Sequence, residues 1–117
     1  MLDYIFSKRL APPYFLCIHF KPELEWLSAY LFQISDRRCY EWIKEGINDV
    51  VCKKVEYIER DMEWYGAKIQ SETTLIYPTI GEDNQEAQVI STSDFADVIS
   101  AWIEEKEKYD VWKTTIE

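Results

Sequence analysis

One histidine and three cysteines are the residues best suited to acid–base or nucleophilic chemistry in this 117-residue chain. His19 lies in an apolar, strand-like run, and no G-x-S-x-G, H-E-x-x-H or phosphate-binding glycine motif accompanies it. Cys17, Cys39 and Cys52 are odd in number and show no C-x-x-C spacing, so we expect three free thiols in a reducing compartment. We therefore expect no catalytic residue, no metal ion and no cofactor.

Carboxylates are abundant, and a pair of them is the remaining route to catalysis. Hydrolysis of the glycosidase type needs two carboxylates across a cleft, one of them with a raised pKa. In this sequence the acids gather where turns and helix surfaces are expected, notably at Glu82, Asp83, Glu86, Glu104, Glu105 and Glu107. The turn sequence GEDNQE does not match the calcium loop D-x-[DN]-x-[DN]-G. The sequence therefore predicts a protein that is not an enzyme, with a small carboxylate-based hydrolase as an alternative.

A second pattern favours protein binding. Residues 56–65, EYIERDMEWY, interleave acids with large apolar side chains. Aromatic side chains anchor protein–protein interfaces, while carboxylates pair with Lys and Arg and orient the partner. The candidate partner-binding residues come from this segment and from the acidic turn: Glu59, Asp61, Glu63, Trp64, Glu82, Asp83 and Glu86. Because strands of half-buried sheets are also rich in Trp and Tyr, a core position is the alternative for Trp64.

The charge of the chain favours a basic partner. The net charge of −9 is uneven: residues 1–81 carry 12 acids and 10 bases, whereas residues 82–117 carry 10 acids and 3 bases. Such a field repels nucleic-acid phosphates and anionic lipids and attracts basic proteins. No stretch of about 18 apolar residues is present, and the first residues lack the basic start of a secretory signal. We expect a cytoplasmic protein without a direct nucleic-acid or membrane partner.

The length and the 47% apolar content predict one domain over residues 1–117 with enough material for a core. Apolar side chains that recur with the period of a strand or of a helix locate the secondary structure. The expected strands are 4–8, 14–20, 55–60, 62–70, 73–80 and 87–91, and the expected helices are 22–33, 37–51 and 91–109. This order predicts an α+β fold with an antiparallel sheet of about five or six strands, helices packed mainly on one face, and an amphipathic C-terminal helix.

Alternation within the strand expected at 62–70 assigns its side chains to two faces. Tyr65, Ala67 and Ile69 share the face that we assign to the core, and Trp64 belongs to the other face. If helices cover only one face of the sheet, Trp64 and its flanking acids are the best candidates for an edge that contacts a partner.

Local signals also mark the ends of the other elements. Ser35 and Asp36 are expected to cap the second helix, and Pro78 is expected to place its strand at an edge or at a bulge. The final helix carries the clearest buried stripe, at Phe95, Val98, Ile99, Trp102 and Ile103. We expect the residues after 109 to form a tail.

Over roughly residues 40–106 the order of elements is familiar. It runs from WIKEGINDVV through acidic strands to YGAKI and TTLIYPTI, then through an acidic turn to AQVISTSDFADVISAWIEE. This order resembles the small bacterial immunity proteins of contact-dependent growth inhibition and related polymorphic toxin systems. The first third of the chain has no part in the resemblance.

The resemblance implies a protein that binds a cognate toxin domain, commonly a basic nuclease, and neutralises it by covering its substrate-binding surface. Because such families vary most at the surface that faces the toxin, no individual binding residue is carried over. A non-catalytic adaptor that self-associates stays as a further alternative. It predicts an exposed apolar strip near Pro78 or along the C-terminal sequence YDVWKTTIE.

Overall fold

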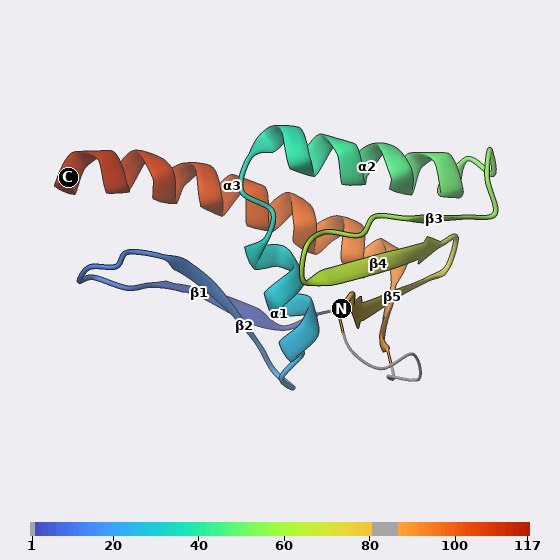
Figure 1. The fold of residues 1–117 in the computed structure, drawn as a ribbon, viewed down its shortest axis with the longest axis horizontal. Coiled ribbons are helices and arrows are strands. Elements are labelled where there is room, and N and C mark those ends of the chain that lie inside the picture. Colours follow the sequence, from blue (N-terminus) through green and yellow to red (C-terminus); the bar gives the residue numbers. More distant parts are fainter. Residues whose placement is uncertain (1, 81–86) are drawn as a thin grey trace.

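The computed structural model describes residues 2–80 and 87–117 of the chain. In chain order these residues form β1 (Tyr4–Lys8), β2 (Leu16–Phe20), α1 (Glu25–Phe32), α2 (Arg37–Val51), β3 (Tyr57–Glu59), β4 (Tyr65–Gln70), β5 (Thr73–Pro78), β6 (Gln88–Ser91) and α3 (Thr92–Ile116) (Figure 1). The strand pairings are antiparallel. The predicted α+β class and the C-terminal helix are confirmed.

The six described strands form two sheets, whereas the sequence predicted one. β3, β4, β5 and β6 pair in that order, and β1 pairs with β2 alone. α1 follows β2 in the chain and lies between the two sheets, where Ser28 Oγ donates a hydrogen bond to the Ile18 carbonyl at 3.0 Å (Figure 1). Because α1 takes this side of β2, β2 does not join the larger sheet.

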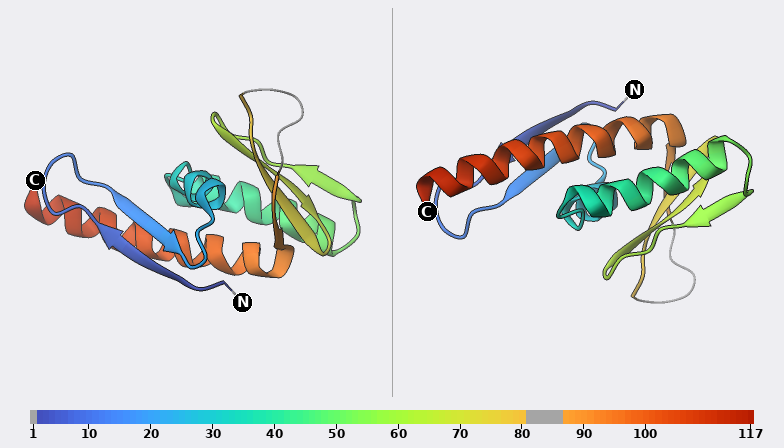
Figure 2. Two further views of the ribbon diagram at one scale, coloured as in Figure 1. Left: turned by 90° about the horizontal axis from the view of Figure 1, so that it is seen from below. Right: turned by 90° about the horizontal axis from the view of Figure 1, so that it is seen from above.

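The described helices pack against the same face of the four-stranded sheet (Figure 2). Alternate residues of the strands point into this layer, and the most buried of them are Ala67, Ile69, Thr74, Ile76 and Ile90. Two pairs of polar groups in the core are hydrogen-bonded, whereas the buried Tyr109 hydroxyl has no partner among the described residues. The Thr74 and Thr92 hydroxyls lie 2.8 Å apart, and the Trp102 indole N–H donates to the Ile34 carbonyl at 2.9 Å. The core therefore tolerates these polar groups because each one is hydrogen-bonded.

Capping residues and apolar stripes explain the two longer helices. The Asp36 carboxylate accepts a hydrogen bond from the Cys39 N–H at 2.9 Å, and the Ser91 hydroxyl accepts one from the Asp94 N–H at 3.0 Å. The predicted cap at Asp36 is thereby confirmed. The predicted buried stripe of α3 is confirmed at Phe95, Val98, Ile99, Trp102 and Ile103.

The prediction of a tail after residue 109 is wrong, because α3 continues to Ile116. Neither Gly nor Pro interrupts this segment, and Lys106–Asp110 and Lys113–Glu117 form ion pairs at the i,i+4 spacing. Trp112 packs against the rings of Tyr14 and Tyr109, with centroids 6.0 and 5.7 Å away. The β1–β2 hairpin and the last turns of α3 therefore support each other (Figure 2).

Two further predictions need correction. Helix α1 begins at Glu25, so Pro22 precedes it by three residues and does not occupy its first turn. Pro78 belongs to a central strand, β5, and not to an edge. It is nevertheless the last residue of β5 and lies beyond Ile76, the last residue of β5 that pairs with β6. The missing N–H of Pro78 therefore removes no hydrogen bond between these strands.

None of the described helices is both long enough and apolar enough to cross a lipid bilayer.

Candidate partner-binding surface

The second face of the four-stranded sheet carries no helix among the described residues (Figure 2). We call it the open face and define it by the side chains that point away from the helices: Tyr57, Glu59, Asp61, Lys68, Leu75, Tyr77 and Val89. Tyr57 is 49% exposed and Val89 is 60% exposed, whereas Leu75 and Tyr77 are half-buried. The open face therefore presents aromatic and aliphatic side chains to solvent.

Glu63 and Trp64 form the connection between β3 and β4. The Met62 N–H donates to the Tyr65 carbonyl at 3.0 Å, so the hairpin pairing extends up to these two residues. The prediction that Trp64 belongs to a strand is wrong, because β4 begins one residue later. The core position weighed for Trp64 is also wrong, since Trp64 is 56% exposed at the end of the hairpin.

Two side chains from other elements hold the backbone of this turn. The Gln33 side-chain oxygen accepts hydrogen bonds from the Trp64 N–H at 2.8 Å and from the Tyr65 N–H at 3.2 Å. On the opposite side, the Thr79 N–H donates to the Trp64 carbonyl at 2.9 Å, and the Thr79 hydroxyl donates to the Glu63 carbonyl at 2.7 Å. The turn backbone is therefore fixed while the Trp64 ring stays accessible.

A row of three residues crosses the open face next to the turn. Asp61 lies opposite Gly66, and Gly66 pairs with Tyr77 on the next strand. The Tyr77 hydroxyl donates a hydrogen bond to the Asp61 carboxylate across Gly66. A Cβ at Gly66 would overlap this carboxylate and lie 2.7 Å from a Tyr77 ring carbon, so the row needs glycine for close approach.

Burial raises the pKa of Tyr77 well above its usual value, and the hydrogen bond to Asp61 raises it further. Tyr77 therefore stays protonated at neutral pH and keeps the Asp61 carboxylate in a fixed orientation.

The next row of the open face contains an acid and a base. Glu59 pairs with Lys68, and the Lys68 ammonium lies 4.5 Å from the centre of the Tyr57 ring. This stretch of the open face combines two carboxylates, one ammonium and two aromatic rings.

The opposite side of the same hairpin is attached to α2. The Arg60 guanidinium donates to the Trp42 carbonyl at 3.0 Å and lies 4.7 Å from the centre of the Trp42 ring. It also fills the space beside Gly46, where an added Cβ would meet the Arg60 side chain at 3.0 Å. The Tyr30 hydroxyl donates to the Arg60 carbonyl at 2.8 Å. Only the acidic and aromatic side of the hairpin therefore remains available to a partner.

The structure gathers four of the seven predicted binding residues on this hairpin. Glu59 and Asp61 belong to the open face, and Glu63 and Trp64 belong to the turn. The other three, Glu82, Asp83 and Glu86, lie outside the described residues.

Sequence reasoning missed five residues of the open face, namely Tyr57, Lys68, Leu75, Tyr77 and Val89. Within residues 73–78 the strand alternation separates Thr74 and Ile76 from Leu75 and Tyr77, and this signal was available in the sequence. It does not say which of the two sets faces the helices, because both are apolar enough for a core. That choice follows from packing with the helices.

The single histidine has a hydrogen-bond partner on the smaller sheet. His19 Nε2 and the Ser7 hydroxyl lie 2.8 Å apart, and both side chains are exposed. No carboxylate joins this pair within the described residues. A nucleophilic serine needs an oriented base and an oxyanion site that excludes water. An exposed Ser–His pair on a hairpin surface provides neither of these.

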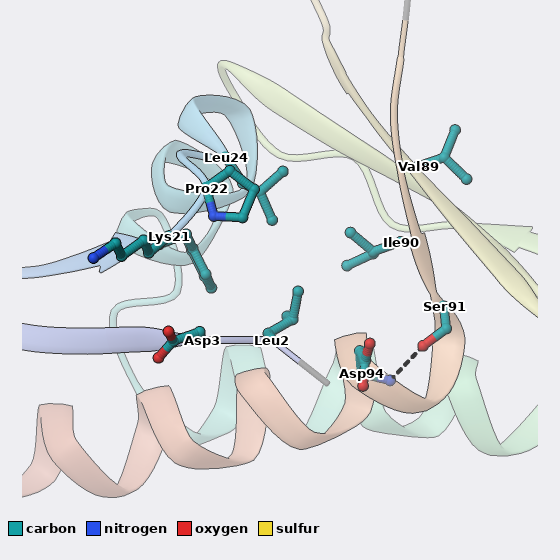
Figure 3. A pocket seen from close by; sticks show the side chains of 10 residues that line it. Leu2, Asp3, Lys21, Pro22, Leu24, Val89, Ile90, Ser91 and Asp94 are labelled. Carbon is teal, nitrogen blue, oxygen red and sulfur yellow. Dashed lines mark hydrogen bonds between the residues drawn. The ribbon is translucent and has the colours of Figure 1, made fainter.

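A depression of about 300 Å³ lies between the start of β1, the end of β2 and β6. Figure 3 shows that the Asp3 and Asp94 carboxylates at its rim come from different elements, with Leu2 between them. Asp94 lies in the first turn of α3, where a negative charge stabilises the helix. Lys21 and apolar side chains such as Leu24 and Val89 complete the lining. The lining therefore combines acidic, basic and apolar residues.

The cysteines are free thiols, as the sequence predicted. Cys17 and Cys39 are half-buried, Cys52 is exposed, and burial raises the pKa of the Cys17 and Cys39 thiols. Over residues 2–80 and 87–117, no three His, Cys, Asp or Glu side chains are grouped as ligands for a metal ion.

No family model, no curated protein and no solved structure matches this chain.

Proposed function

We propose that this protein is not an enzyme and that it binds a basic partner protein through the open face and the turn at Glu63 and Trp64. One observation carries the proposal: the open face exposes Tyr57 beside the Glu59 carboxylate at one edge and Val89 at the other edge. Exposed apolar side chains next to charged groups are typical of surfaces that bind other proteins. The net charge of −9 adds long-range attraction for a basic partner.

The rigidity of the turn supports a binding role for Trp64. Gln33 and Thr79 hold its backbone from both sides, so the indole ring is presented without a further loss of backbone freedom. Preorganised contact residues lower the entropic cost of association. Tryptophan is also among the residues most often found at the energetic centre of an interface.

We further propose that the partner is a cognate toxin domain with a basic nuclease surface. Support comes from the resemblance of residues 40–106 to immunity proteins and from the excess of acids in the chain. Carboxylates placed where nucleic-acid phosphates would bind compete for the same Lys and Arg side chains of the toxin. The protein would then inhibit by covering the substrate-binding surface.

Isothermal titration calorimetry with the product of the adjacent upstream gene, at two salt concentrations, tests this proposal. We expect tight binding that weakens at the higher salt concentration. Trp64→Ala should weaken binding roughly 30-fold, about 2 kcal/mol, as expected for a central anchor. Phe32→Ala is the matched control, because Phe32 is 57% exposed but belongs to α1 beside β2.

Two charge-reversal variants test whether the acidic side chains of this surface contribute to binding. Glu63→Lys and Glu104→Lys change the net charge equally, but Glu63 lies in the turn whereas Glu104 is exposed on α3. We expect Glu63→Lys to weaken binding more than Glu104→Lys. Equal effects of the two variants would contradict the assignment of this surface. Absence of binding at either salt concentration would contradict the partner itself.

A further inference from the structure

β1 is an edge strand whose outer side has no partner among the described residues. It is hydrogen-bonded only to β2, and the pairing continues past the strand ends with Arg9 N–H to the Phe15 carbonyl at 3.0 Å and Lys21 N–H to the Asp3 carbonyl at 2.9 Å. Hydrogen-bonded positions alternate along an antiparallel strand. The backbone N–H and C=O groups that point away from β2 therefore belong to Tyr4, Phe6 and Lys8.

This edge lacks most of the features that prevent strands from pairing with other chains. β1 contains neither proline nor a bulge, and its register with β2 is continuous over five residues. Ile5 is 67% exposed on the face of the hairpin that points away from α3, while Phe6 packs towards Trp102 with ring centroids 6.4 Å apart. Figure 2 shows β1 at the outside of the molecule, with β2 between it and α1.

The sequence of the hairpin differs in charge from the rest of the chain. Residues 1–21 carry one acid, Asp3, and three bases, Lys8, Arg9 and Lys21, which gives +2. The remaining residues carry 21 acids and 10 bases, which gives −11. The sequence of the hairpin is therefore basic, although Asp94 and Asp97 of α3 line a depression together with Asp3 and Tyr4.

We propose that β1 pairs antiparallel with β1 of a second copy of this chain, about a two-fold axis at Phe6. Phe6 then lies opposite Phe6 of the second copy, and Tyr4 lies opposite Lys8, so the outward backbone groups of each strand meet those of the other. The two hairpins form one continuous four-stranded antiparallel sheet. This interface is separate from the open face and does not depend on the proposed function.

The charges select this register over its neighbours. With the axis at Phe6, Asp3 lies opposite Arg9 of the second copy on the exposed face, and the symmetry repeats this ion pair at the other end. Opposite charges on facing strand positions stabilise antiparallel pairs. Shifting the axis to Ile5 places Asp3 opposite Ser7, and shifting it to Ser7 places Arg9 opposite Ile5. Neither alternative pairs an acid with a base.

Sedimentation velocity over a wide concentration range, without any partner, tests whether the second copy binds. We expect a concentration-dependent dimer. Hydrogen exchange followed by NMR locates the contact, because the amides of Tyr4, Phe6 and Lys8 should become protected only as the dimer forms. The amides of Ile5 and Ser7 already face β2 and should change little. A monomer at every concentration, or a dimer without this alternating protection, would overturn the proposal.

A charge swap tests the register. Asp3→Arg and Arg9→Asp each place like charges opposite each other twice, so each should raise the dissociation constant of the dimer about tenfold. The double variant Asp3→Arg/Arg9→Asp restores both pairs and should return the constant to within about threefold of the original. Arg38→Asp on α2 is the control, because it changes the net charge as Arg9→Asp does. Failure of the double variant to restore dimerisation would overturn the register.

Lys8→Pro tests the edge, and Lys8→Ala is its control, because both variants lose the Lys8 ammonium that lies 4.0 Å from the centre of the Trp112 ring. The Lys8 N–H points away from β2, so proline removes an intermolecular hydrogen bond and none within the hairpin. We expect loss of the dimer with the far-ultraviolet circular dichroism of the folded chain retained. A folded Lys8→Pro variant that still dimerises as strongly as the original would overturn the proposal.

Discussion

The two faces of the four-stranded sheet are built from alternate residues of the same strands, and they differ in almost every physical property. On the covered face, Ala67, Ile69 and Ile76 are fully buried beneath the helices. On the open face, Tyr57 and Val89 are about half or more exposed, at 49% and 60%. One face therefore supplies folding free energy through burial, while the other keeps apolar area accessible.

Side chains on the two faces contribute to different properties, namely stability on the covered face and binding on the open face. Truncation on the covered face leaves a cavity that the surrounding core cannot fill, so it lowers the free energy of unfolding. Truncation on the open face leaves water where the side chain was, so stability changes little and any partner loses a contact. Variants on neighbouring positions of one strand distinguish these cases directly.

The largest expected effect is on the covered face. Ile76→Ala should lower the free energy of unfolding by about 2–5 kcal/mol, because Ile76 is fully buried between β5 and the helices. Urea denaturation followed by circular dichroism measures this change. Leu75→Ala, one residue away on the open face, is the control and should cost clearly less. Equal losses for both variants would mean that the open face is covered in solution.

A second effect tests the close approach at Gly66. Gly66→Ala should cost about 1–3 kcal/mol, because its Cβ would displace Asp61 and Tyr77 from their hydrogen bond. In an Asp61→Ala background the same substitution should cost less, since one of the two clashes is gone. A double-mutant cycle from urea denaturation measures this coupling. If the stability losses of Gly66→Ala and Asp61→Ala simply add, the added Cβ at Gly66 does not clash with Asp61.

The third prediction concerns alkaline pH. The pKa of Tyr77 is raised in the folded protein, so its contribution to stability is complete below the ordinary tyrosine pKa of about 10 and is lost as the pH rises further. Tyr77→Phe should cost about 1 kcal/mol near neutral pH through the lost hydrogen bond to Asp61.

The fall in stability above about pH 10 should also be shallower in Tyr77→Phe than in the original protein. Thermal unfolding at a series of pH values measures both slopes. The pKa of Tyr30 is raised by burial as well, so part of the alkaline destabilisation should remain in the variant. Parallel slopes for the two proteins would contradict the role assigned to Tyr77.

The smallest expected effect on stability is at the turn. Trp64→Ala should change the free energy of unfolding by no more than about 0.5 kcal/mol, because the ring is exposed and the backbone bonds to Gln33 and Thr79 remain. Gln33→Ala, which removes the hydrogen bonds from the Trp64 and Tyr65 N–H groups and leaves those of Thr79, should cost more. Urea denaturation of both variants checks the order. A reversed order would indicate that the Trp64 ring packs in the fold.

Much of the local structure was predictable because its causes lie within one or two turns of chain. The stripe from Phe95 to Ile103, the cap at Asp36 and the alternation from Tyr65 to Ile69 each follow from neighbouring residues. The sequence also pointed to Glu59, Asp61, Glu63 and Trp64 as one surface, and the structure places them on one hairpin. These four residues lie close together because they are near neighbours in the sequence, within one short hairpin.

The errors share a different cause, which is competition between elements far apart in the chain. Trp64 lies in a turn because Gln33, 31 residues earlier, holds its N–H. Trp112 lies in α3 and not in a tail because it packs on Tyr14, far earlier in the chain.

By itself, the sequence determined the α+β class, the periodicity of the strands and helices, the acidity of the surface and the free thiols. These depend on composition and on interactions between near neighbours. For the residues that the structure describes, only the tertiary structure decided that the strands divide into two sheets, which face of the larger sheet carries no helix, and that the outer edge of β1 pairs with no strand. Those outcomes depend on packing between segments that are far apart in the sequence, because one segment can occupy a place that another would otherwise take. Once α1 lies beside β2, the larger sheet cannot extend, and one edge and one face are left for other molecules.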